Sequence, residues 1–423
     1  MSSTTAASTS KLRGEGAWLL RLTLVTLLVG LGAGAVGIAV DLALQLLQHL
    51  AFGYSSGSLL EGVTQAPPWR RFASLVAAGV VGGIGWWALR RWGPHVVSVE
   101  RAAKGTPMPL KTTIANAALQ IGIVGLGASI GREAAPRELG ALFADKVTRV
   151  AGLSERETKI LVACGAGAGL AAVYNVPFGG ALFVVEILLA EVSFATLLPA
   201  FAASALAAAV ARVVVPVSPM YALPHVVVTP QLVGWAVVAG PLIGLAASGF
   251  VRVTRIAAST KPRGRAILWA MPLIFAGVGA ISLFLPEVLG NGKAAAQTVF
   301  SGTAPLALVT LLLIAKTATT VGTIKAGAAG GTLTPSVAIG AMLGIALGSV
   351  VNLVMPGTST AAFAFVGAAA FLASTMRAPM TGLILVTEFT GQGPELLIPG
   401  MAAIAGALAV VYFLERTRLS DIA

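Results

Sequence analysis

One acidic residue, Glu133, stands where a carboxylate could do chemistry. It lies in Gly131-Arg-Glu-Ala-Ala-Pro136, directly after a run from Thr112 to Gly131 that carries no charge. A carboxylate embedded in an apolar span is energetically costly and is usually functional. We expect Glu133 to fill an anion site when it is ionised and to leave that site when it is protonated, which makes it a gate or a proton carrier. The alternative is an interfacial carboxylate paired with Arg132 or Arg137.

A second stretch broken by glycine and proline lies in the other half of the chain, at Gly330-Gly-Thr-Leu-Thr-Pro335. A helix that begins inside a membrane exposes its first N–H groups and the positive end of its dipole, and such ends attract anions. Glycine lets an ion approach the backbone, and proline suits the first helical turn. Matching interruptions in two halves of a membrane protein indicate a binding site. The alternative is that these are packing glycines at helix kinks.

The two halves also share a longer repeat, because Gly165–Glu186 can be superposed on Gly367–Glu388 by a shift of 202 residues. The matched positions include a proline, a glycine and a glutamate at the same spacing, and this spacing rarely arises by chance. For Glu186 and Glu388 we expect structural pairing or helix capping. The repeat predicts a first membrane repeat over residues 17–215 and a second over 216–423. Residues 1–16 are polar and rich in serine and threonine, which predicts a disordered tail.

The composition requires a membrane protein. Of the 423 residues, 57% are hydrophobic and 10% are charged, against about 25% charged in soluble domains. The uncharged runs do not alternate in polarity as barrel strands do, so we predict an all-α polytopic fold in a lipid bilayer. The net charge of +12 is scattered between apolar spans, which fits the positive-inside bias and excludes a nucleic-acid interface. The run from Ala326 to Met376 must contain two helices, broken near Met355-Pro356-Gly357.

Two other features allow different interpretations. Gly127-Ala-Ser-Ile-Gly131 matches a hydrolase nucleophile elbow, so an intramembrane hydrolase built on Ser129 is a rival, although no base lies at a suitable spacing. A cation-coupled solute carrier is a second rival. Lys316 and Lys325 stand near the end of a span, where we expect their side chains to snorkel toward the interface.

The chain resembles the CLC family of chloride channels and chloride/proton antiporters, from about Leu75 to the C-terminus. Gly131–Pro136 is similar to the family's GREGP element, with Glu133 at the gating position. Gly330–Pro335 is similar to its GGxFxP element, and Gly165–Glu186 to its glycine-rich helix that ends in N-x-P and then Glu.

The resemblance implies a homodimer in which each subunit is an inverted repeat of tilted and broken helices with its own pore. It implies chloride or a similar small inorganic anion as the substrate, no cofactor and no enzymatic activity. The short tails favour the inner membrane of a prokaryote. The residues expected to form the anion path around Glu133 come from both elements and are Gly131, Arg132, Ala134, Ala135, Thr332, Leu333 and Thr334.

The chain also departs from the family pattern. The first anion-site element is altered to His95–Glu100, where Ser98 replaces the usual serine only after a shift of register. Thr334 resembles the fluoride-exporting branch, but Thr332 stands where that branch has a glutamate. Ser420 lies closest to the family's central tyrosine. Ile187 stands where many antiporters have a second, proton-relaying glutamate, so both channel-like conduction and proton-coupled antiport remain open.

Overall fold

Apolar helices account for most of the chain in the computed structural model, which describes residues 2–215, 217–354 and 356–420 and leaves out the side chains of residues 2–15, 17 and 418–420. Within those ranges, eight helices are long and apolar enough to cross a membrane, and no strand forms. The predicted all-α polytopic fold is confirmed.

The chain divides into two units, and the first consists of residues 1–38, 97–110 and 136–215. Its helices are the N-terminal part of α1 (Ser2–Phe52), α4 (Val99–Ala102), most of α6 (Ala134–Val150), α7 (Glu155–Tyr174), α8 (Pro177–Phe183), the π-helix η1 (Val184–Leu188) and α9 (Phe194–Ala211). Glycines let these helices approach closely: a Cβ on Gly30 of α1 would lie 3.0 Å from the carbonyl oxygen of Ala203 in α9.

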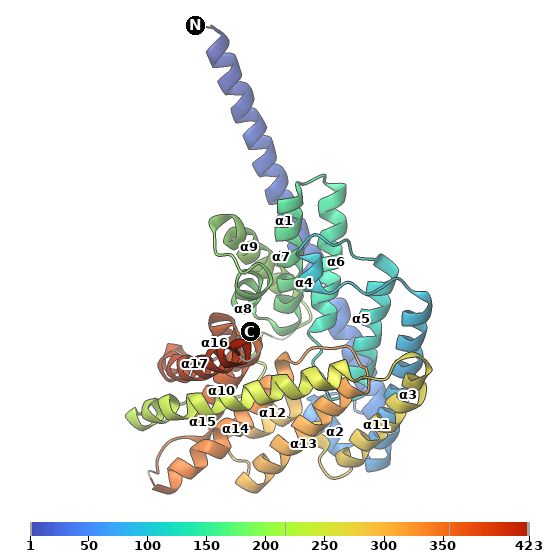
Figure 1. The fold of residues 1–423 in the computed structure, drawn as a ribbon, viewed down its shortest axis with the longest axis vertical. Coiled ribbons are helices and arrows are strands. Elements are labelled where there is room, and N and C mark those ends of the chain that lie inside the picture. The colour runs from blue at the N-terminus through green and yellow to red at the C-terminus, as the bar shows by residue number, and fades with distance from the viewer. Residues whose placement is uncertain (1, 216, 355, 421–423) are drawn as a thin grey trace. The chain divides into compact units, whose positions relative to one another are not determined.

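The second unit consists of residues 39–96, 111–135 and 216–423. Besides the rest of α1 and the start of α6, its elements are α2 (Leu59–Gln65), α3 (Pro68–Trp92), α5 (Leu110–Gly125), α10 (Pro230–Ser259), η2 (Gly264–Ala266), α11 (Ile267–Ser282), η3 (Pro286–Val288), α12 (Lys293–Phe300), α13 (Leu306–Lys325), α14 (Leu333–Val354), α15 (Thr360–Met376), α16 (Pro379–Thr390), η4 (Pro394–Leu396) and α17 (Leu397–Ser420). Within this unit α14 packs along α15, α10 along α17, and α3 along α11 (Figure 1).

The repeat read from the sequence has the same helix end and the same following helix start in both copies. Asn175 ends α7 and Arg377 ends α15, and each is a left-handed cap with a φ of 53°. Non-glycine residues rarely adopt this conformation. In both copies, a proline two positions later begins the next helix, Pro177 in α8 and Pro379 in α16, because proline suits the first helical turn. Two equal and uncommon helix ends, 202 residues apart, therefore support a common structural unit.

Each copy also packs its helix against a preceding one through glycine. In the second copy, a Cβ on Gly340 of α14 would lie 2.7 Å from the carbonyl oxygen of Gly367 in α15. In the first copy, a Cβ on Gly140 of α6 would collide with the carbonyl oxygen of Gly165 in α7. The abundant glycine therefore serves helix–helix packing at these two crossings, where no side chain fits.

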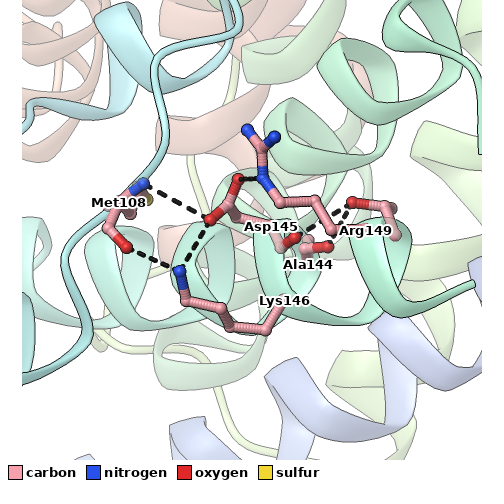
Figure 2. A network of polar contacts seen from close by, with 6 residues as sticks. Met108, Ala144, Asp145, Lys146 and Arg149 are labelled. Carbon is pink, nitrogen blue, oxygen red and sulfur yellow. Dashed lines mark hydrogen bonds and ion pairs between the residues drawn. The ribbon is translucent and has the colours of Figure 1, made fainter. Parts of the chain in front are cut away.

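One buried acid organises the polar end of α6. Asp145 accepts hydrogen bonds from Arg149 Nε at 2.7 Å, Lys146 Nζ at 3.1 Å and the Met108 amide at 3.3 Å. Figure 2 shows the carboxylate between the two basic side chains, with Lys146 also donating to the Met108 carbonyl at 2.7 Å. This network holds the segment before α5 against α6.

Two predictions about organisation have different outcomes. The predicted helix break near Met355 is confirmed on either side, since α14 ends at Val354 and α15 begins at Thr360; Met355 itself lies outside the described residues. Residues 2–16 belong to α1, and the predicted tail over residues 1–16 stays a prediction. The division into repeats at 215 and 216 stays a prediction.

Candidate functional site

The two segments broken by glycine meet backbone to backbone. Gly131 and Gly331 form an isolated antiparallel bridge, in which the Gly131 amide donates to the Gly331 carbonyl at 2.7 Å and the Gly331 amide donates back at 3.0 Å. Helix α6 begins three residues after Gly131, and α14 begins two residues after Gly331. The bridge therefore fixes the start of α14 beside the residues that lead into α6.

Glu133 projects onto the start of α14. Its side chain is fully buried, its Oε1 accepts a hydrogen bond of 2.6 Å from the Leu333 amide, and its Oε2 accepts one of 3.2 Å from the Thr334 hydroxyl. The first N–H group of a helix has no partner within the helix, and the helix dipole favours a negative charge there. The carboxylate therefore occupies a position that would suit a small free anion equally well.

Glycine is required around this carboxylate. A Cβ on Gly131 would collide with both carboxylate oxygens of Glu133, and a Cβ on Gly331 would collide with its Cγ and Cδ as well as Oε1. The backbone can approach the charged group because these residues lack side chains. Glycines from both elements therefore frame one carboxylate, and the role of these residues in an anion site stays a prediction.

Arg132, the residue before Glu133, belongs to a cluster of charged side chains. Arg132 forms an ion pair with Asp41 of α1, with 2.8 Å between Nη1 and Oδ1, and both side chains are largely buried. Lys293, at the start of α12, lies within electrostatic reach of both. Two cations and one carboxylate leave this cluster with an excess of one positive charge, which favours anions nearby.

Lys316 is the residue that sequence reasoning missed. The expected snorkelling is wrong, because the side chain is fully buried in α13. Its ammonium donates three hydrogen bonds: to Ser129 Oγ at 2.9 Å, to the Val288 carbonyl at 2.9 Å and to the Gly290 carbonyl at 2.8 Å. A lysine has three donors, so these oxygens satisfy it completely and make burial of the charge possible.

This ammonium lies close to the start of α14. A Cβ placed on Gly292 would be 3.3 Å from Lys316 Cε and 3.2 Å from the Thr334 carbonyl oxygen. Only a glycine therefore separates the lysine stem from the helix end that holds Glu133. No sequence pattern marked Lys316, because its acceptors are distant in the chain.

Ser129 has a structural environment. Its hydroxyl lies 2.9 Å from Thr319 Oγ1 and 3.3 Å from Thr320 Oγ1, besides accepting from Lys316. A lysine that donates three hydrogen bonds has no lone pair with which to deprotonate a serine. The serine is also fully buried. These contacts suit a loop anchor and do not suit a nucleophile.

The remaining predicted residues lie in different places. Ala134 and Ala135 form the first turn of α6, and the Thr332 carbonyl accepts from the Ser336 amide at 2.9 Å. Ser98 is the N-cap of α4, where its hydroxyl accepts from the Arg101 amide at 3.4 Å. Ser420 ends α17, and its side chain lies outside the described residues. The roles of these residues in anion binding stay predictions.

Comparison with known proteins gives one consistent result. A match to the family described as voltage gated chloride channel covers residues 79–412. Over 401 residues the chain is 28% identical to the voltage-gated ClC-type chloride channel ClcB of Escherichia coli, covering 90% of this chain and 93% of that protein.

Solved structures share the fold. The chain is similar to a slow cyanobacterial Cl⁻/H⁺ antiporter, with a TM-score of 0.80 and 20% identity over 93% of this chain and 95% of the other. It is also similar to a CLC-type fluoride/proton antiporter, with a TM-score of 0.74, 20% identity and the same coverage of both chains.

Proposed function

The chain belongs to the CLC family of voltage gated chloride channels, and from this premise we propose that it transports chloride, or a similar small anion, along a path that Glu133 gates. The observation that carries the proposal is the 2.6 Å hydrogen bond from the Leu333 amide to the Glu133 carboxylate. A group that binds a tethered carboxylate with an amide at a helix start also binds a free halide. Glu133 and the transported anion therefore compete for one position.

The proposed cycle follows from this competition. When Glu133 is ionised, its carboxylate holds the Leu333 amide and the Thr334 hydroxyl and excludes the anion. Protonation removes the charge that the helix dipole stabilises, so the side chain leaves and an anion takes its place. The backbone bridge between Gly131 and Gly331 keeps the binding position formed while the side chain moves.

Fixed positive charge supports the anion in the open state. Lys316 places a buried ammonium beside the start of α14, and the cluster of Arg132, Asp41 and Lys293 carries an excess of one positive charge. Charges in a site of low dielectric act more strongly than charges in water. An anion that enters is therefore stabilised without a mobile counter-ion.

Coupling to protons distinguishes two versions of the proposal. The two solved relatives named above are proton antiporters for chloride and for fluoride, whereas the relative from Escherichia coli is named a channel. Ile187, which stands where a second glutamate would relay protons, favours uncoupled transport in this chain. An imposed chloride gradient should drive protons uphill only in the antiporter, so parallel chloride, fluoride and proton fluxes in liposomes decide between them.

We further propose that the multi-pass chain works as a homodimer in a prokaryotic inner membrane, with no cofactor. Cross-linking of the purified protein in detergent and in liposomes tests the dimer. A cross-linked band at twice the monomer mass in both settings supports it. A monomer in both contradicts it.

The gate itself is tested by Glu133→Gln in liposomes. Glutamine keeps the shape of the side chain but removes the charge, so anion efflux at neutral pH should rise to the level that the wild type reaches in acid, and its dependence on pH should disappear. Glu395→Gln, an exposed carboxylate in η4, is the matched control and should behave as wild type. Unchanged efflux and an unchanged pH profile for Glu133→Gln would refute the gate.

A further inference from the structure

A cavity of about 290 Å³ lies within the second unit, and neither Glu133 nor its partners Leu333 and Thr334 line it. Its walls come from the last turns of α10, the end of α15 and the C-terminal half of α17. Three arginines line it, Arg252, Arg255 and Arg377, all of them exposed, together with Glu415 and the buried Ser374. Its lining is therefore strongly basic for a cavity among apolar helices.

The charges in this cavity do not cancel. Arg377 forms an ion pair with Glu415, which neutralises the one carboxylate in the lining. Neither Arg252 nor Arg255 has an ion pair with a described residue. Two guanidinium groups, one helical turn apart on α10, therefore contribute positive charge that the described lining does not balance.

The Ser374 hydroxyl supplies an independent observation. Ser374 is 3% exposed, it lines the cavity, and its Oγ has no hydrogen-bond partner among the described residues. Its neighbour Thr375 donates to the Leu372 carbonyl at 3.0 Å, in the manner usual for hydroxyl residues in helices. A buried hydroxyl without a partner costs free energy, so a ligand or ion in the cavity is the natural partner.

Helix ends alone do not explain this arrangement. Arginines near the C-terminus of a helix complement its dipole and often snorkel toward lipid head groups. That explanation covers Arg252 and Arg255 taken singly. It does not explain why three guanidinium groups and a buried hydroxyl line the same cavity.

We propose that this cavity binds a phosphate-type oxyanion, either free or as the head group of an anionic phospholipid. Guanidinium groups bind phosphate through paired, charge-assisted hydrogen bonds, and a serine hydroxyl donates one more. The cavity exceeds the size of one phosphate and leaves room for the ester of a head group. This binding is separate from transport and does not depend on the gate.

Thermal unfolding of the full-length protein in detergent tests the free form. Inorganic phosphate should raise the thermal midpoint of the wild type, and the rise should grow with the logarithm of the phosphate concentration above the dissociation constant. The double variant Arg252→Gln/Arg255→Gln should weaken phosphate binding by roughly tenfold or more. Arg263→Gln/Arg265→Gln removes the same charge from an exposed loop outside the cavity and should leave the phosphate response unchanged.

Ser374→Ala separates binding from folding. Because the hydroxyl has no partner among the described residues, its loss should not lower the thermal midpoint without phosphate, but it should reduce the shift that phosphate causes. The lipid form is tested in vesicles of phosphatidylcholine with and without phosphatidylglycerol. If only phosphatidylglycerol raises the midpoint, and the arginine double variant abolishes the rise, the ligand is the lipid head group.

Two outcomes would overturn the proposal. One is that neither phosphate nor phosphatidylglycerol stabilises the wild type more than the arginine double variant. The other is that the control pair in the exposed loop loses the response to the same extent, because the effect would then reflect net charge alone.

Discussion

The Glu133 carboxylate accepts a 2.6 Å hydrogen bond from the Leu333 amide, a residue 200 positions later in the chain. Both residues lie next to the paired glycines, so the side chain comes from one broken segment and its binding position from the other. The gate that we propose therefore requires both segments. Substitutions on either side of this contact should change transport in directions that the geometry fixes.

Replacing Gly131 by alanine should displace the gate. The three heavy atoms nearest to the added Cβ all belong to the Glu133 carboxyl group, which can move, whereas the backbone bridge stays in place. We expect Gly131→Ala to raise chloride efflux at neutral pH, as we expect for Glu133→Gln. Gly277→Ala in α11, where a Cβ meets nothing within 4 Å, serves as the control. Efflux at the wild-type level from Gly131→Ala would contradict the close fit.

Removing the second contact should move the pH of opening. Thr334→Val keeps the shape of the side chain but deletes the hydroxyl that donates to Glu133 Oε2. The hydroxyl donates a stronger hydrogen bond to the ionised carboxylate than to the protonated acid, so its loss should open the gate at a higher pH. Hydrogen bonds to charged groups contribute about 1.5 kcal/mol or more, and the closed state should lose this stabilisation.

The measurement for Thr334→Val is chloride efflux from liposomes as a function of pH. Thr310→Val, which deletes an exposed hydroxyl bonded only within α13, is the control and should keep the wild-type profile. A shift of the Thr334→Val profile toward lower pH would show that the hydroxyl does not stabilise the closed state.

The buried ammonium of Lys316 should matter for transport. Lys316→Met removes the positive charge beside α14 while filling much of the same volume, so we expect chloride flux per folded protein to fall roughly tenfold, or about 1.4 kcal/mol. Lys325→Met, at the end of the same helix, removes an equal charge that bonds to Thr260 in a loop, and should have little effect. Equal fluxes from the two variants would rule out a special role for Lys316.

Asp145 should contribute to stability. Asp145→Asn removes the charge that Arg149 and Lys146 share, and we expect a loss of about 2–3 kcal/mol, since both cations can partly rehydrate. The thermal midpoint in detergent measures the effect. Glu155→Gln breaks the exposed pair with Lys159 and should leave the midpoint unchanged. Similar midpoints for both variants would mean that burial adds nothing to the Asp145 network.

Much of the fold could be predicted because proline and glycine mark the breaks in apolar runs. The proline and glycine after Met355 mark a real helix break, and the repeat ending in Glu186 and Glu388 marks equal helix ends. The full length of α1 could not be predicted, because helix continues through polar residues on both sides of the apolar run that begins at Leu22. Hydropathy detects the apolar part of a helix and not its ends.

The candidate site was predictable only in part. Glycine and proline around Glu133 and Leu333 indicated an anion site, since backbone exposure depends on local sequence. The partners of Lys316 depend on tertiary structure, because Ser129 and Gly290 in loops and Val288 at the end of η3 are joined to α13 by no local pattern. The same reasoning applies to the pair of Asp41 and Arg132, which are 91 residues apart.

The long separation between Glu133 and Leu333 has a consequence for biogenesis. The ribosome synthesises Glu133 200 residues before Leu333. The first segment therefore reaches the bilayer before the amide that will bind the Glu133 carboxylate has been made. Until the later helix arrives, that acid must stay hydrated or carry a proton. Insertion of the early helices is therefore provisional, and the last third of translation completes it.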